Sequence, residues 1–267
     1  MHDMPLVIFT VLSQLAIGGF VTLWWIDQKS TIQRKTGLLI SLSLVVIGGI
    51  AVLVSLFHLG HPFAAYRAIL NIKVSWLSRE VTFYGAFVGL SMLYSWFWIK
   101  DAASWRGMTG AVATILGILA IFSSAKIYMI PAIPAWNSMT TMFMFFLTSI
   151  LLGPLFVGVF LIIRGELSMN LTAVVIVGFI AATVVMLVYF SGLQGGLPQA
   201  AESLRLAVGQ LIFWVRLFTF IIAFAILAIT AIGKQKQTGT IYTVVFVLIL
   251  ISEFLARLQF YETAVHL

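Results

Sequence analysis

The chain has 267 residues, of which 62% are hydrophobic and only 9% charged. Soluble domains carry roughly a quarter charged residues, so this composition excludes a water-soluble fold and makes lipid the solvent for most of the chain. The sequence has no cysteine, which excludes thiolate-held iron–sulfur clusters and cysteine-ligated zinc in this chain. The net charge of +7 is expected to mark cytoplasmic loops rather than nucleic-acid binding.

Continuous apolar runs of about 20 residues predict an all-α integral membrane protein, because strands of a barrel would alternate with polar positions. The eight predicted spans are Pro5–Ile26, Gly37–Leu59, Val81–Ile99, Gly107–Ile130, Met139–Ile163, Leu171–Leu193, Val208–Ile232 and Gly239–Tyr261. No linker interrupts them, so residues 1–267 are expected to form a single transmembrane domain. The first run lacks a basic flank and a cleavage site, which favours an uncleaved span.

The basic residues predict that both termini lie on the outer, periplasmic side of the cytoplasmic membrane. In that orientation the eight basic residues at the inner loops are Lys29, Arg34, Lys35, Lys100, Arg106, Arg164, Lys234 and Lys236, and the five at the outer side are Arg67, Lys73, Arg79, Lys126 and Arg205. The two longer loops, Gly60–Glu80 and Gln194–Ala207, then both lie outside. Residues 67–79 are expected to form an interfacial amphipathic helix.

Ionisable residues inside spans are rare and usually functional. With this topology they gather in the outer half of the bundle, at His58, Glu80, Lys126, Arg216, Glu253 and Arg257. A transporter needs polar groups near the midplane, whereas a site that takes its substrate from lipid needs them at one level.

Structural interpretations of these residues stay open beside the functional one. Glu253 and Arg257 would form an ion pair, being four residues apart on one helix face. Arg216 and Lys126 would extend to the outer interface. Glu80 and His58 would cap helix ends.

The four histidines do not predict a haem. His58 and His61 are three residues apart at one helix end and cannot face each other across a porphyrin, while the other two are near the termini. The chain also lacks a P-loop, a dinucleotide-binding fingerprint and an HExxH motif. No metal site is expected in this chain.

One stretch resembles a known family. From His58 to Glu80 the chain reads HLGHPFAAYRAILNIKVSWLSRE, which is similar to the H-L-G-x-P and S-x-L-S-x-E pattern of the DmsC family, the membrane anchor subunit of anaerobic dimethyl sulfoxide reductase. The stretches PLVIFTVLSQLAIGGF, IPAWNSMTTMFMFFLTSILLGP and EFLARLQFY match in the same order, so the resemblance covers nearly the whole chain.

The resemblance implies a haem-free anchor of eight spans that oxidises menaquinol near the outer face. It implies two partners there: an iron–sulfur subunit with 4Fe-4S clusters and a catalytic subunit with a molybdenum bis-guanine-dinucleotide cofactor. It places the quinol-binding proton acceptors at His58 and Glu80. The sequence departs from the pattern by having His61 at the variable position and Arg79 before the glutamate. Possible supporting residues are His61, Arg67, Arg79, Glu253 and Arg257.

The chemistry of quinol oxidation suits these residue types. A quinol releases two electrons only as it releases two protons, so it needs a proton acceptor such as histidine, with a carboxylate nearby. The protein would then carry the quinol half-reaction of an oxidoreductase complex without a redox cofactor of its own. Two alternatives are a small-solute transporter working alone and an anchor that reduces quinone in the opposite direction. The terminal electron acceptor, the quinone species and the oligomeric state are left open by the sequence.

Overall fold

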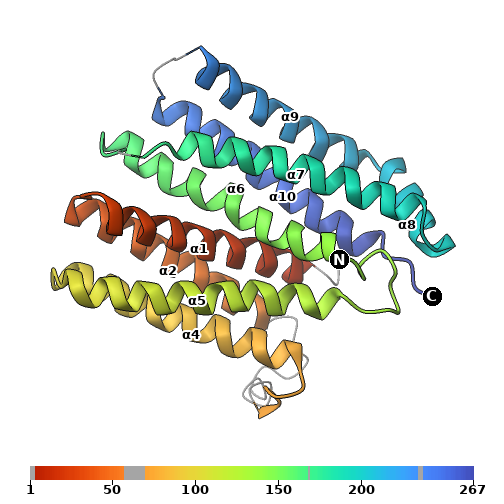
Figure 1. Ribbon diagram of the computed structural model, residues 1–267, viewed down its shortest axis with the longest axis horizontal. Helices are drawn as coiled ribbons and strands as arrows, with labels where there is room; N and C mark the ends of the chain where they lie inside the picture. Colours follow the sequence, from red (N-terminus) through yellow and green to blue (C-terminus); the bar gives the residue numbers. More distant parts are fainter. Residues whose placement is uncertain (1–3, 57–69, 168, 234–236) are drawn as a thin grey trace.

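The computed structural model describes residues 4–56, 70–167, 169–233 and 237–267, and all regular structure within them is helical (Figure 1). The helices are α1 (Met4–Lys29), α2 (Arg34–Leu56), α4 (Trp76–Ile99), α5 (Ala103–Tyr128), α6 (Met139–Ile163), α7 (Leu171–Gln194), α8 (Pro198–Gly209), α9 (Leu211–Ile232) and α10 (Gly239–Glu262). The predicted all-α architecture is confirmed.

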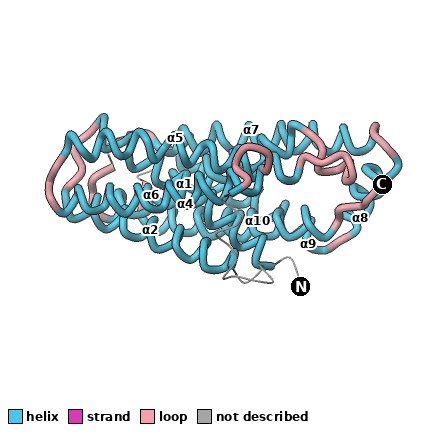
Figure 2. Tube along the Cα trace, turned by 90° about the horizontal axis from the view of Figure 1, so that it is seen from below, coloured by secondary structure: helices cyan, strands magenta, loops and turns pink. Residues whose placement is uncertain are grey.

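Long helices that follow one another in the chain run antiparallel, whereas α1 and α6 lie side by side in the same direction; together they form a flattened bundle, in which the turns gather at the two ends (Figures 1 and 2). Helix α1 lies in the middle, in contact with α2, α5, α6 and α10. Helices α4 and α5 form one flank, and α7 and α9 form the other. The start of α1, the end of α10 and helix α8 lie at the same end, which is called the α8 end below.

Seven of the described helices are long and apolar enough to cross a membrane: α1, α2, α5, α6, α7, α9 and α10. Helix α4 has 24 residues, as many as α7 and α10, but its sequence WLSREVTFYGAFVGLSMLYSWFWI is richer in serine, tyrosine and tryptophan. The eighth crossing therefore stays a prediction for α4. Both ends of the described chain lie at one end of the bundle, as an even number of antiparallel crossings requires.

The contact between α1 and α6 depends on small residues. A Cβ atom at Gly18 would collide with the backbone carbonyl of Ser149, and one at Gly153 would collide with the backbone of Gly18. Small residues let membrane helices approach closely, so that backbone and side-chain packing replaces the hydrophobic effect, which is weak between helices in lipid. This contact fixes the distance between the two halves of the bundle that carry the polar residues.

Two connections at the α8 end differ in detail from the prediction. Most of the expected loop Gln194–Ala207 is helix α8, which buries Ala200, Ser203 and Ala207 at spacings of three and four residues. The predicted interfacial helix 67–79 is not continuous: residues 67–69 lie outside the described residues, Leu70 is helical, residues 71–74 make a turn, and α4 begins at Trp76. Ser75 caps α4, because its hydroxyl accepts a hydrogen bond from the Ser78 amide at 3.3 Å.

Candidate functional site

Glu80 lies in the second turn of α4 and is only 6% exposed. It lines a small cavity between α1, α4 and α5 together with Ser13, Gln14, Tyr84 and Ser124. Since Ser75 is the helix cap and Glu80 lies beyond the first turn, the capping interpretation of Glu80 is wrong. A buried carboxylate that neither caps a helix nor forms an ion pair is expensive to keep in an apolar bundle, which favours a functional role.

The other residues predicted around Glu80 are only partly described. His58, His61 and Arg67 lie outside the described residues. Arg79 turns away from Glu80: its guanidinium donates to the carbonyls of Ile72 at 2.9 Å and Lys73 at 2.6 Å, and it lies 4.1 Å from the Trp76 ring centre. Arg79 thus holds the turn before α4 in place, which is a structural contribution to the site.

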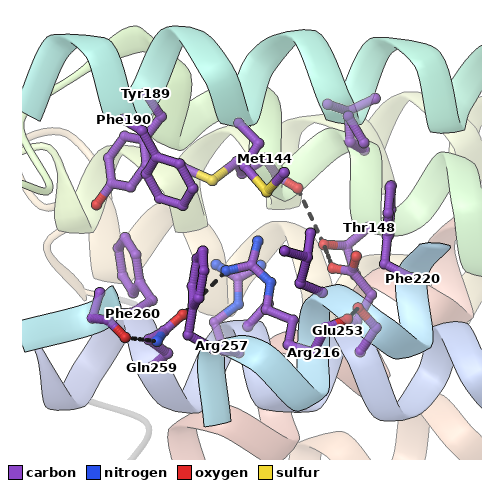
Figure 3. Close-up of a pocket in the computed structure, with 18 of the residues that line it drawn as sticks. Met144, Thr148, Tyr189, Phe190, Arg216, Phe220, Glu253, Arg257, Gln259 and Phe260 are labelled. Carbon is purple, nitrogen blue, oxygen red and sulfur yellow. Dashed lines mark hydrogen bonds between the residues drawn. The ribbon is translucent and has the colours of Figure 1, made fainter. Parts of the chain in front are cut away.

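A larger cavity lies on the other flank, between α6, α7, α9 and α10, with α8 closing one end (Figure 3). Its volume is about 90 Å³, against about 10 Å³ at Glu80. Figure 3 shows Tyr189 and Phe190 on one side of this space and Arg216, Glu253 and Arg257 on the other. Both residues of the predicted Glu253–Arg257 pair therefore line this cavity, which is called the α9 cavity below.

The predicted ion pair between Glu253 and Arg257 is not formed. Within the described residues, the ion pairs shorter than 4.0 Å join Arg106 to Asp27 and Arg205 to Glu202. Glu253 instead accepts a hydrogen bond from the Thr148 hydroxyl at 2.6 Å. Arg257, 5% exposed, donates to Gln14 at 3.1 Å, and its guanidinium lies 3.7 Å from the Phe145 ring centre.

The interpretation that Arg216 extends to the outer interface is wrong. It lines the α9 cavity and donates to the Gln259 side-chain oxygen at 3.3 Å. The amide nitrogen of Gln259 in turn donates to the carbonyl of Ala207 on α8 at 2.9 Å, so Gln259 orients Arg216 from the end of the bundle. Lys126 lies 5.8 Å from the Trp76 ring centre.

Gln14 joins the two cavities. It lies on α1, lines the Glu80 cavity, and accepts the hydrogen bond from Arg257 on α10 through its side-chain oxygen. Its amide nitrogen is buried and has no partner among the described residues. The sequence interpretation considered charged residues only and so missed Gln14, although a lone amide in an apolar span is itself a signal.

The opposite end of the bundle contains a second buried polar group that was missed. Arg106 was assigned to an inner loop, yet its side chain is only 10% exposed and makes two hydrogen bonds to Asp27, at 2.7 and 2.9 Å. Tyr94 donates to the same carboxylate at 2.9 Å, and the Arg106 guanidinium lies 3.7 Å from the Trp98 ring centre. Because Asp27 and Arg106 are on different helices, their sequence separation gave no sign of this pair.

These features define a class of protein: a multi-pass helical membrane protein that gathers buried polar side chains in two cavities nearer the α8 end. The part of the chain that the structure describes holds no cluster of metal-ligating residues. The chain belongs to the DMSO reductase anchor subunit (DmsC) family, whose model matches residues 1–263.

Individual relatives agree with the family. The sequence is 26% identical to the C subunit of anaerobic dimethyl sulfoxide reductase from Escherichia coli (strain K12), over 97% of this protein and 94% of that relative. It is 27% identical to the anaerobic dimethyl sulfoxide reductase subunit YnfH of the same organism, over 67% and 64% of the two proteins. It is 29% identical to the C subunit of the Haemophilus influenzae reductase, where the match spans little more than half of that relative, 56%.

Proposed function

We propose that this chain anchors a molybdenum and iron–sulfur oxidoreductase complex of the dimethyl sulfoxide reductase type in the cytoplasmic membrane and oxidises menaquinol near the outer face. Family membership supports the anchor role. A reductase consumes electrons, so its anchor has to take them from quinol rather than deliver them to quinone. The observation that carries the quinol site is Glu80, a buried carboxylate in a polar cavity near the α8 end.

The reaction needs only proton acceptors and a route for electrons. Quinol loses two protons and two electrons to become quinone. His58 and Glu80 take the protons in this proposal, and the electrons pass to an iron–sulfur subunit docked at the α8 end. The chain has no cysteine to hold such a cluster itself. The partner subunits therefore supply the 4Fe-4S clusters and the molybdenum cofactor.

The size of the Glu80 cavity limits how a quinol can reach it. A cavity of about 10 Å³ has room for about one water molecule. The proposal therefore requires a quinol hydroxyl, and not the ring, to approach Glu80, either directly or through one water. Ser13, Gln14 and Ser124 supply polar groups around such a hydroxyl.

The test separates the two histidines of the motif. In the assembled complex, His58→Ala is expected to abolish turnover with a quinol donor and to leave turnover with a soluble viologen donor intact, because viologen feeds the peripheral subunits directly. His61→Ala is the matched control and is expected to be milder. If His61→Ala loses quinol-driven turnover and His58→Ala keeps it, His61 and not His58 is the proton acceptor. Two normal variants would rule out this site.

A further inference from the structure

The α9 cavity is separate from the Glu80 cavity and contains its own charged groups. We propose that the α9 cavity binds the ring of a second quinone or quinol molecule, apart from the one oxidised beside Glu80. This inference shares with the proposed function only the premise that the protein meets quinones in the membrane.

The α9 cavity has the size and walls for a ring. A single water needs roughly 10–15 Å³ of cavity, so about 90 Å³ corresponds to several waters and accommodates a flat bicyclic ring. Apolar side chains make most of its walls, and eight of the 22 lining residues are aromatic or methionine: Met144, Phe145, Met186, Tyr189, Phe190, Phe213, Phe220 and Phe260. Such walls with a few polar groups are typical of sites for apolar ring compounds.

The charges in the α9 cavity select the kind of ligand. Its charged lining residues are Arg216, Glu253 and Arg257. Two guanidinium groups offer donors to a carbonyl or phenolate oxygen, and the carboxylate offers an acceptor to a hydroxyl. A quinone or quinol ring carries oxygens at opposite edges and uses both kinds of group. A phosphate head group has only acceptors and would be repelled by Glu253, so a phospholipid fits less well.

The hydrogen bonds within the α9 cavity leave these groups available to a ligand. Thr148 is the hydrogen-bond partner of Glu253, and Arg216 makes one long bond to Gln259, at 3.3 Å. Neither arginine forms an ion pair with a described residue. Arg257 is buried, and Arg216 and Glu253 are partly buried. Charges withdrawn from water without ionic partners reduce stability, and a ligand that completes their hydrogen bonds offsets that cost.

The position of Gln14 keeps the two sites distinct. Arg257 on α10 donates a hydrogen bond to Gln14 on α1, and Gln14 lies between the α9 cavity and the Glu80 cavity. A ring in the α9 cavity therefore lies against α7, α9 and α10, whereas a quinol at Glu80 lies near α1, α4 and α5. Peptides from these helices distinguish the two sites.

Photolabelling of the assembled complex in lipid nanodiscs with an azido-2-methyl-1,4-naphthoquinone tests the inference. Wild type is expected to carry label in peptides of α7, α9 or α10, and unlabelled naphthoquinone should compete with it. Ala182→Leu places a larger side chain in the α9 cavity and should reduce this label about tenfold, with label near Glu80 unchanged. Arg216→Gln should weaken labelling in the same peptides.

Ala231→Leu is the matched control, because Ala231 is exposed on α9 and does not line the cavity. Both alanine variants should keep viologen-driven turnover, which shows that the complex is assembled. Equal labelling of α7, α9 and α10 in Ala182→Leu and wild type overturns the inference, as does competition by phosphatidylglycerol in place of naphthoquinone. Label near Glu80 alone overturns the second site and leaves the proposed function standing. Label in the α9 cavity and none near Glu80 supports the second site and counts against the proposed quinol site at Glu80.

Discussion

The two ends of the bundle bury charged side chains in different ways. At the end away from α8, Asp27 is paired with Arg106 through two short hydrogen bonds and with the Tyr94 hydroxyl. In the half nearer α8, Glu253 and Arg257 lie on one helix, four residues apart, and yet make no ion pair. Their hydrogen bonds go to the neutral side chains of Thr148 and Gln14.

We interpret this difference as that between a structural contact and a candidate functional site. A buried pair whose hydrogen bonds are made fixes the geometry of the helices that carry it. Buried charges held by neutral partners gain little for stability, and their presence in an apolar bundle is explained by a ligand or by proton transfer. We therefore interpret the Asp27–Arg106 pair as a helix clamp and the half with Glu80 and Glu253 as the working part of the anchor.

The functional interpretation of the two ends depends on which of them faces outward. We predict that the α8 end faces outward, and the labelling experiment that tests this has an all-or-none outcome. Lys35 and His266 are exposed at opposite ends, and the sequence has no native cysteine. In cells lacking the partner subunits, a membrane-impermeant thiol reagent should label His266→Cys and should reach Lys35→Cys only after the membrane is disrupted. The opposite pattern would place the α8 end in the cytoplasm and remove the basis of the outer-face proposal.

The Asp27–Arg106 pair should have the largest effect on stability. Asp27→Asn leaves Arg106 buried without its counter-charge, so the free energy of unfolding should fall by about 3–5 kcal/mol. Thermal unfolding of the purified anchor in detergent measures this. Quinol- and viologen-driven turnover should fall together, because a poorly folded anchor releases its partners. An unchanged unfolding temperature would show that the pair is not a clamp.

Glu253→Gln makes the same carboxylate-to-amide change in the other region and should behave differently. The amide oxygen can still accept from Thr148, and the charge removed is only partly buried, so the free energy of unfolding should change by less than about 1 kcal/mol. Labelling of the α9 cavity by the azido-naphthoquinone should nevertheless weaken. A loss of stability as large as in Asp27→Asn would make Glu253 a structural residue.

The smallest effect is expected at the exposed pair on α8. Arg205 holds the pKa of Glu202 below its usual value through two hydrogen bonds. The small contribution of the Glu202–Arg205 pair to the stability of the protein should be present above the ordinary pKa of a glutamate and be lost as pH falls through the lowered value.

Arg205→Glu together with Lys73→Glu should loosen the attachment of the peripheral subunits, and the attachment of the wild-type protein should weaken with salt. Attachment that is insensitive to both would move the docking surface elsewhere.

The sequence predicted the long helices well and the contacts between them poorly. All eight predicted runs match long described helices, with bounds that differ by no more than five residues, because the length of a span follows from hydropathy. Helix α8 lies within the predicted connection Gln194–Ala207, where Pro198 at its start and the spacing of Ala200, Ser203 and Ala207 indicate a helix. The polar side chains between these positions, among them Glu202 and Arg205, hid that pattern.

The polar residues show the same division. The depths of Glu80, Glu253 and Arg257 were predictable, since depth follows from position along a span, but the polar group of Asp27, Tyr94 and Arg106 at the other end was not expected. The partners of the polar side chains were not predictable, because Gln14 with Arg257 and Asp27 with Arg106 pair across helices that are distant in sequence. The motif from His58 to Glu80 made Glu80 a candidate through family resemblance. Its burial and its cavity appear only once α1, α4 and α5 are packed together.

The ratio of quinol-driven to viologen-driven turnover in Glu80→Gln tests the central claim most directly, with Asp27→Asn as the reference. Glu80→Gln keeps the shape of the side chain and removes its ability to take a proton, so the ratio should fall by about 10²-fold or more while viologen-driven turnover stays at the wild-type level. In Asp27→Asn both activities should fall and the ratio should stay constant. An unchanged ratio in Glu80→Gln, or a parallel loss of both activities, would contradict the assignment of this half of the bundle to quinol oxidation.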